Sequence, residues 1–242
     1  MQLLLGYLYP DLMNIYGDTG NVIALKKRCE WRNIEFEIKK ISLETNPEEL
    51  KKCDLFFFGG GQDHQQIIVS EDLHKRTGAI LKTMLENSTP LLSICGGFQL
   101  LGKFYNFEGK SLPGINFFDV KTAAGKTRFI NNVLAETEVA GKKELLIGFE
   151  NHSGRTYILN PKTKPLGKVI SGHGNNGEDR TEGAIKNNAV GSYLHGSLLP
   201  KNQFLTDFLL KKALSRKYGE VILKPLEDRF ESQAREAAKI LF

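Results

Sequence analysis

The sequence predicts an α/β protein in which a mostly parallel central sheet is flanked by helices. Three short, strongly apolar runs in the first hundred residues, "LLLGYLY", "DLFFFGGG" and "PLLSIC", are typical of buried strands. Stretches with helical spacing separate them, and this alternation predicts parallel strands covered on both faces. Ligands of such sheets bind at the carboxyl ends of the strands, where "YGDTGN", "FGGGQDHQQ" and "SICGGFQ" lie.

The remaining elements follow in order along the chain. We expect a helix over about 21–32, a strand over 34–41, a short helix after Pro47 and a helical stretch over 71–87. From about residue 113 the sequence has shorter strand-like pieces, and "AVGSYLHG" then returns to an apolar strand. Two amphipathic helices are expected at 202–216 and 227–242. Since neither a repeat nor a linker interrupts the chain, a single domain over 1–242 is predicted, with the C-terminal helices included.

Composition excludes several classes of protein. The 242 residues carry a formal charge of +5, but Lys and Arg alternate with acidic residues along the chain, which argues against nucleic acid as a partner. No apolar run approaches the roughly 18 residues that span a bilayer, and the first residues lack the features of a signal peptide, so no transmembrane segment and a cytoplasmic location are predicted. The three cysteines are too widely spaced for a disulfide framework or a zinc site, and no metal site is predicted.

Cys95 lies where a strand is expected to turn into a helix. A helix N-terminus favours the thiolate, which is the nucleophilic form of cysteine. Gly96 allows close approach of a substrate, and its N–H can help to bind an oxyanion. A buried packing cysteine before a glycine turn is the alternative interpretation.

A nucleophilic cysteine needs a base, and His195 is the best placed of the five histidines. It follows an apolar run and precedes a glycine, so it is expected at the same sheet edge as Cys95. In the glycine run before Gln62, the N–H groups of Gly60 and Gly61 can complete an oxyanion hole, although a tight turn also explains the glycines.

One segment imitates a nucleotide-binding motif. "AAGKT" at 123–127 ends like a phosphate-binding loop, but the earlier glycine that such a loop requires would fall at Val120. No cofactor site is therefore predicted in this chain.

Together these segments resemble the class I (triad-type) glutamine amidotransferases, and within them the branch related to cobyric acid synthase. The resemblance is carried by Cys95 in "ICGGFQLLG", by the loop "GGGQD" and by His195 in "SYLHG". "NIYGDTGN", "GFENHSGRTY", "GHGNNGEDRTEG" and "YLHGSLLPKN" are similar to the glutaminase subunits of lipid II isoglutaminyl synthases. The resemblance implies a flavodoxin-like fold and hydrolysis of L-glutamine to glutamate and ammonia through a Cys95 thioester.

The resemblance also implies roles for residues around the two catalytic groups. Arg128 would pair with the substrate carboxylate, as a guanidinium can do in bidentate fashion, although a surface charge is the simpler interpretation of its position. The further substrate-binding residues expected are Gln99, Gln62, Asn151 and His152.

Two departures from the family pattern leave alternatives open. Many class I enzymes have Glu two residues after the histidine, where this chain has Ser197, and Ser93 replaces the glycine that usually begins the elbow. A Cys-His dyad or a third residue from elsewhere is therefore expected. A glutaminase subunit of another amidating synthetase (cobyrinic acid type), a catalytically inactive binding subunit, and a γ-glutamyl hydrolase or cysteine peptidase are the alternatives.

Ammonia made here must be used by a synthetase. The resemblance implies a heterodimer with a MurT-like Mur ligase that holds ATP and Mg²⁺ and amidates the D-glutamate α-carboxylate of lipid II to D-isoglutamine. Lipid II would be reached through that partner, at the inner face of the membrane.

Overall fold

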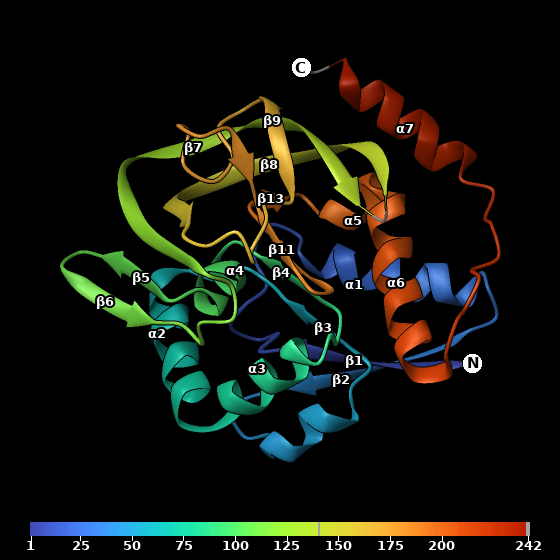
Figure 1. Cartoon of the computed structure of the whole chain (residues 1–242), viewed down its shortest axis with the longest axis horizontal. Coiled ribbons are helices and arrows are strands. Elements are labelled where there is room, and N and C mark those ends of the chain that lie inside the picture. Colours follow the sequence, from blue (N-terminus) through green and yellow to red (C-terminus); the bar gives the residue numbers. More distant parts are fainter. Residues whose placement is uncertain (140, 241–242) are drawn as a thin grey trace.

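The computed structural model describes residues 1–139 and 141–240, and its core is a six-stranded sheet (Figure 1). Along the sheet the strands follow the order β11-β12-β4-β3-β1-β2, and all neighbours are parallel except the pair β11 and β12. Their bounds are β1 Gln2–Leu8, β2 Glu35–Ile41, β3 Leu55–Phe58, β4 Leu91–Ile94, β11 Ala184–Lys186 and β12 Ala189–Ser192. The predicted α/β class with a mostly parallel sheet is confirmed.

Helices cover both faces of this sheet, which is why its central strands are apolar on both sides. All four residues of β3 and of β4 are buried. α1 packs against α5 and α6, while η1 packs against α3 on the other side of the sheet (Figure 1). The helical bounds are α1 Thr19–Glu30, η1 Pro47–Lys52, α2 Asp63–Asp72, η2 Leu73–Thr77, α3 Gly78–Glu86, α4 Gly96–Leu101, α5 Leu198–Lys201, α6 Gln203–Tyr218 and α7 Arg229–Lys239.

A second, mostly antiparallel sheet forms where short strands were expected. Its strands are β5 Phe104–Phe107, β6 Lys110–Pro113, β7 Val120–Val139, β8 Lys142–Ile158, β9 Gly167–Ser171, β10 Thr181–Glu182 and β13 Leu194–His195. β7 and β8 are long and pair along nearly their whole length, with a register shift between Ala124 and Phe129. The expectation of short pieces was wrong because the glycines at 125, 148 and 154 lie inside the strands, where neighbouring side chains crowd their α-carbons.

The chain passes from the first sheet to the second just before His195. β12 ends at Ser192 in the parallel sheet, and after Tyr193 the two residues of β13 pair with Glu150 and Phe149 of β8. The apolar run that was expected to be one strand is therefore two. This crossing places His195 between the sheets.

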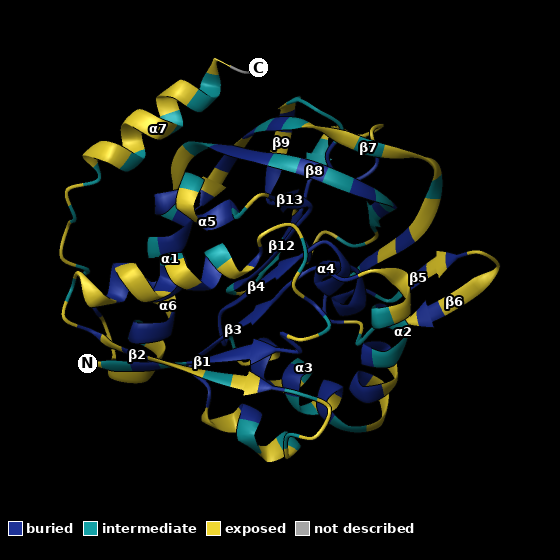
Figure 2. Ribbon diagram, turned by 180° about the vertical axis from the view of Figure 1, so that it is seen from behind, coloured by how far each residue is buried: buried dark blue, intermediate teal, exposed yellow. Residues whose placement is uncertain are grey.

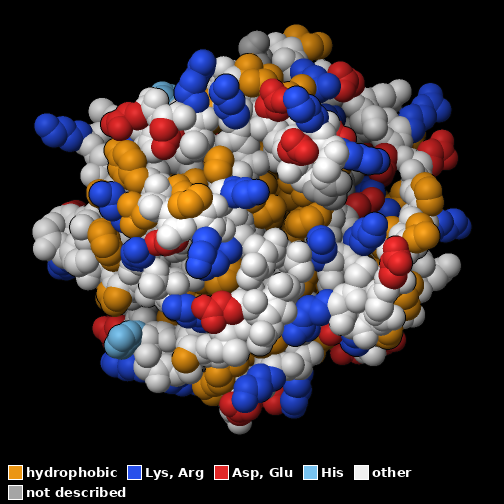
Figure 3. Space-filling view, viewed as in Figure 1, with side chains coloured by type: hydrophobic (Ala, Val, Ile, Leu, Met, Phe, Trp, Pro, Cys, Tyr) orange, Lys and Arg blue, Asp and Glu red, His pale blue; other side chains and the backbone are white. Residues whose placement is uncertain are grey.

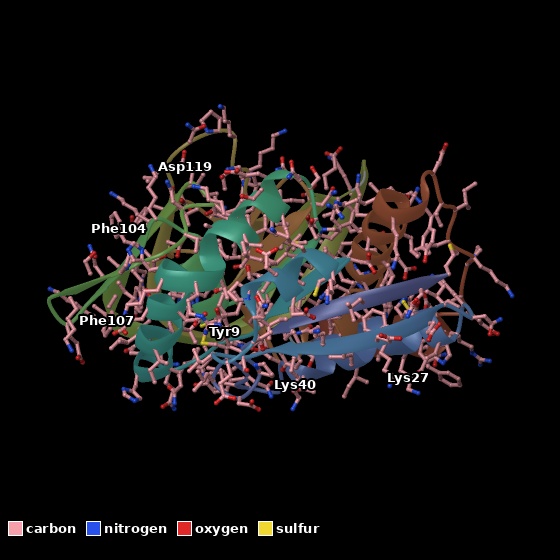
Figure 4. All side chains as sticks on the ribbon, turned by 90° about the horizontal axis from the view of Figure 1, so that it is seen from below. Tyr9, Lys27, Lys40, Phe104, Phe107 and Asp119 are labelled. Carbon is pink, nitrogen blue, oxygen red and sulfur yellow. The ribbon has the colours of Figure 1, made fainter. Side chains whose placement is uncertain are left out.

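The helices differ from expectation mainly at their ends. The stretch expected at 71–87 is helical from Asp63, with a turn of π-helix at Leu73–Thr77. α7 covers Arg229–Lys239, and the last two positions of the helix expected to reach 242 lie outside the described residues. Tyr9, labelled in Figure 4, joins β1 to the π-helical turn through hydrogen bonds with Asp72 and Thr77.

The outer surface is polar and mixed in charge. The core strands are buried, whereas α7 is largely exposed (Figure 2). On the face shown in Figure 3, Lys and Arg side chains are interspersed with Asp and Glu. Within residues 1–139 and 141–240, no helix has the length and apolar character needed to cross a bilayer.

Candidate active site

Cys95 occupies a sharp corner between β4 and α4. Its backbone has φ 50° and ψ −107°, a region that costs a non-glycine residue about 1–3 kcal/mol. The N–H of Cys95 donates to Ser192 O at 2.8 Å, which ties the corner to the neighbouring strand. The next turn fits closely, since a Cβ on Gly97 would lie 2.6 Å from Phe58 O. The strained corner presents the thiol at the sheet edge, as the sequence predicted.

The other two cysteines differ from Cys95 in their surroundings. Burial raises the pKa of the Cys29 thiol and of the Cys53 thiol to about 12, so both are unreactive packing groups at neutral pH. All three thiols are free. Cys95 borders a pocket at the sheet edge.

His195 is fully buried beside Cys95. Neither ring nitrogen of His195 has a hydrogen-bond partner among the described residues. Burial lowers the pKa of His195, but its interactions with Cys95 and with the carboxylate of Asp18 outweigh the effect of burial and raise the pKa to about 10. An imidazolium beside a thiolate is the form in which cysteine is activated by histidine.

Asp18 is the third member of this cluster, and the sequence analysis did not identify it. Its Oδ1 lies 3.5 Å from Nδ1 of His195, and its Oδ2 accepts a 2.7 Å hydrogen bond from the N–H of Gly60. Asp18 precedes α1 in the position of a helix cap, yet its side chain makes no capping bond. The carboxylate therefore faces both His195 and the N–H of Gly60.

The glycine loop after β3 fits tightly around this cluster. A Cβ on Gly60 would lie 3.2 Å from Cε1 of His195, so a larger residue at this position would crowd the imidazole. Because the N–H of Gly60 is used by Asp18, the expectation that it serves an oxyanion is wrong in this structure. The N–H of Gly61 lies near Gly96, since a Cβ on Gly96 would be 3.1 Å from that nitrogen, and these two amides remain candidates for an oxyanion hole.

A pocket of about 440 Å³ opens over Cys95. This volume is ample for one amino acid, because ligand pockets usually measure 300–1,000 Å³. Its lining is mainly polar and comes from both sheets: Ile15, Tyr16, Gly61, Gln62, Asp63, His64, Gln66, Cys95, Gln99, Tyr105, Arg128, His152 and Ser153.

Arg128 reaches the pocket from β7. Its Nε donates to Asn151 Oδ1 at 2.5 Å, and its Nη2 donates to Asn151 O and to the Tyr16 hydroxyl, each at 3.2 Å. Arg128 is exposed, and these hydrogen bonds hold its guanidinium at the pocket wall. Asn151, which was expected to touch substrate, lies behind Arg128 and positions it.

The other expected substrate-binding residues border the pocket in different environments. Gln62 is exposed at the start of α2. Gln99 is buried; its amide nitrogen donates to the Tyr193 hydroxyl at 3.1 Å, while its Oε1 has no partner among the described residues. His152 stacks on Tyr193 with ring centres 3.7 Å apart. Burial lowers the pKa of His152 despite the nearby Glu150 carboxylate, so its imidazole is neutral at pH 7.

Besides Asp18, which does not line the pocket, sequence reasoning missed several residues of the pocket wall. Tyr16 and Asp18 both come from the segment "YGDTGN", which was noted at a strand end and as part of the family resemblance, without a role for either residue. An acid at that position is a usable signal, because it follows β1 at the same sheet edge as Cys95. Tyr105 and Ser153 carried no such signal, since they reach the pocket from the unexpected second sheet.

Comparisons with known proteins agree with this geometry. Residues 5–203 match the CobB/CobQ-like glutamine amidotransferase domain. The chain is 39% identical over 236 residues to the lipid II isoglutaminyl synthase (glutamine-hydrolyzing) subunit GatD of Staphylococcus aureus (strain N315), covering 97% of this chain and 94% of that protein. The GatD subunit of Streptococcus pneumoniae is also 39% identical, over 96% of this chain and 88% of that protein. A cobyric acid synthase of Clostridium botulinum is 28% identical over 73% of this chain and 37% of its own length.

Solved structures share the fold at low sequence identity. A glutamine amidotransferase matches with a TM-score of 0.57 and 15% identity, covering 86% of this chain and 98% of the other. The PurLQS structure from Thermotoga maritima matches with a TM-score of 0.55 and 15% identity, covering 89% of this chain and 99% of the other. The chain therefore belongs to the CobB/CobQ-like glutamine amidotransferases, in the branch that contains the two GatD subunits.

Proposed function

We propose that this chain is the glutaminase subunit of a lipid II isoglutaminyl synthase. It hydrolyses L-glutamine to glutamate and ammonia and supplies the ammonia to a ligase partner. The observation that carries the proposal is the strained Cys95 corner next to His195 and Asp18, at the base of a pocket walled by Arg128. The similarity to the two GatD subunits over nearly the whole chain supports the choice of synthase.

The reaction follows from the positions of these groups. The Cys95 thiolate attacks the side-chain amide carbon of glutamine, and the N–H groups of Gly61 and Gly96 bind the oxyanion. The His195 imidazolium gives its proton to the leaving nitrogen, which departs as ammonia and leaves a γ-glutamyl thioester on Cys95. Water, deprotonated by the now neutral His195, then attacks the thioester carbonyl, expels the Cys95 thiolate and releases glutamate, which restores the thiolate and the imidazolium.

Asp18 and Arg128 support this reaction in different ways, Asp18 at the histidine and Arg128 at the substrate carboxylate. The Asp18 carboxylate orients the Nδ1 side of His195 and stabilises the imidazolium. The Arg128 guanidinium binds the α-carboxylate of glutamine at the pocket wall, which sets the distance from that carboxylate to the amide carbon.

The acceptor chemistry belongs to a partner in this proposal. A MurT-like Mur ligase holds ATP and Mg²⁺ and activates the D-glutamate α-carboxylate of lipid II, and ammonia converts it to D-isoglutamine during peptidoglycan synthesis. This chain carries no cofactor of its own and works in the cytoplasm, where the partner meets lipid II at the inner face of the membrane.

The test is ammonia release from L-glutamine by the purified chain, alone and with a co-expressed MurT-like ligase. Cys95→Ala is expected to remove release entirely, and the partner is expected to raise it. Release that continues at the wild-type rate in Cys95→Ala would rule out the thioester mechanism. Release without amidation of lipid II in the complex would favour another acceptor, such as that of a cobyrinic acid type synthetase.

A further inference from the structure

Tyr16 lies between the two groups that act on glutamine in the proposed reaction. It belongs to the loop between β1 and α1, has a φ of 53°, and is 46% exposed at the pocket wall. Its ring meets the His195 imidazole edge to face, with centroids 5.0 Å apart. Its hydroxyl contacts Nη2 of Arg128 at 3.2 Å. One side chain therefore touches both the proposed base and the proposed carboxylate anchor.

The hydrogen bonds of Arg128 leave specific donors free. The guanidinium carries five N–H donors, and Nε and Nη2 are held by Asn151 and Tyr16. Nη1 has no hydrogen bond within the described part of the chain, so it is available to one carboxylate oxygen.

The hydroxyl of Tyr16, like the guanidinium of Arg128, has a hydrogen-bond donor that is not used within the described part of the chain. It must accept from Nη2, because a guanidinium cannot accept a hydrogen bond. Its own proton then has no acceptor among the described residues, although the group lies at the wall of a polar pocket. A phenol that accepts from a cation is polarised and becomes a stronger donor.

We propose that Tyr16 is a substrate-binding residue whose hydroxyl donates a hydrogen bond to the α-carboxylate of glutamine, beside Nη1 of Arg128. The inference rests on the proposed function, because it names a contact to that substrate. A carboxylate has two oxygens, and the pair of neighbouring donors, one cationic and one neutral, matches them. The site then selects amides that carry an α-carboxylate over those that do not.

The contact is tested with Tyr16→Phe in the full chain. Phe keeps the ring against His195 and removes only the hydroxyl, and since Tyr16 is half exposed the fold is retained. We expect the KM for L-glutamine to rise about tenfold or more, as for loss of a hydrogen bond to a charged group, with kcat within about twofold of wild type. Tyr157→Phe is the matched control, because Tyr157 does not line the pocket and its hydroxyl contacts Glu178.

A second substrate separates a carboxylate contact from a structural effect. 4-Aminobutanamide is glutamine without its α-carboxylate, and binding of both amides is measured by calorimetry in the Cys95→Ala background, where neither is hydrolysed. Adding Tyr16→Phe is expected to weaken binding of L-glutamine about tenfold and to leave binding of 4-aminobutanamide unchanged. Equal weakening of both amides, or of neither, would overturn the role of Tyr16.

Failure of this inference is distinguishable from failure of the proposed function. If Cys95-dependent glutamine hydrolysis is present and Tyr16→Phe leaves its KM unchanged, the function stands and the Tyr16 contact is wrong. If the wild-type chain binds no L-glutamine and, with or without its partner, releases no ammonia from it, the proposed function and the Tyr16 contact are both wrong.

Discussion

The two sheets build the pocket from opposite kinds of local structure. In the parallel sheet, Cys95 is held by a strained corner between a buried strand and a short helix, and the position of its thiol is set by backbone geometry. On the antiparallel sheet, Arg128 projects from a long strand, and its orientation comes from the side chain and backbone of Asn151 on the paired strand. The difference suggests a division of labour, in which the parallel sheet and the crossing into β13 provide the chemistry, and the long strands β7 and β8 provide recognition.

Asp18→Asn tests the chemical side of this division and has the largest expected effect. Asn keeps the size of the buried side chain, and its oxygen can still accept from Gly60, but its amide N–H₂ would then face Nδ1 of His195. We expect kcat for glutamine hydrolysis to fall about 10³-fold, with a small change in KM, because the imidazolium loses its counterion.

A matched acid at the pocket wall provides the control for this change. Asp63 lines the pocket and is exposed, so Asp63→Asn should leave kcat within about threefold of wild type. Steady-state kinetics of both variants decide the point. A kcat of Asp18→Asn close to that of wild type would mean that His195 works in a dyad.

The same division explains which parts of the fold and of the site could be predicted from the sequence. The parallel sheet and the Cys95 corner were predictable because each depends on local features, namely apolar runs, glycines and strand ends. The long pair β7 and β8 was not, since its strands contain exposed polar residues and internal glycines that imitate loops. For the same reason Arg128 could be placed at the site only by family resemblance.

Asp18 and Asn151 show why the roles of some site residues could not be predicted from the sequence. Asp18 has the sequence context of an ordinary helix cap, and its contact with His195 depends on a crossing between sheets that no local pattern encodes. Asn151 lies in a motif that resembles a substrate-binding segment, yet its side chain is used to hold Arg128. Roles that depend on long-range pairing cannot be derived from residue type and spacing alone.

Glu182→Gln tests the junction between the two sheets, with an effect of intermediate size. Glu182 is fully buried on β10, where it accepts hydrogen bonds from the hydroxyl of Ser192 at 2.7 Å and from the N–H of Tyr193 at 3.0 Å. Burial raises its pKa from 4.5 to about 7, against the effect of those hydrogen bonds. The segment that leads to His195 is therefore anchored on a carboxyl group that titrates near neutral pH.

The sign of the effect follows from proton linkage. Between pH 4.5 and about 7 the folded state holds a proton that the unfolded state has lost, so the free energy of unfolding falls as pH rises through this window. The difference in pKa corresponds to about 3 kcal/mol. Gln is neutral at every pH, so Glu182→Gln should remove the fall in the free energy of unfolding that Glu182 causes. The variant should therefore be more stable than the wild type at pH 8.

Urea unfolding at pH 5 and pH 8 measures this difference, with the exposed Glu178→Gln as control. The control should follow the wild-type pH dependence. Parallel curves for Glu182→Gln and wild type would show that Glu182 is ionised throughout, and the junction would then be held by a charged group.

Arg128→Lys tests the recognition side and has the smallest expected effect. Lys keeps the positive charge but cannot donate from a planar fork, so the contacts to Asn151 and to a carboxylate cannot both be made. We expect the KM for L-glutamine to rise about tenfold while kcat stays within about twofold of wild type. Arg180→Lys, an exposed change outside the pocket, should alter neither constant. A fall in kcat at unchanged KM would instead place Arg128 in the chemical step, and the long strands β7 and β8 would then take part in the chemistry as well as in recognition.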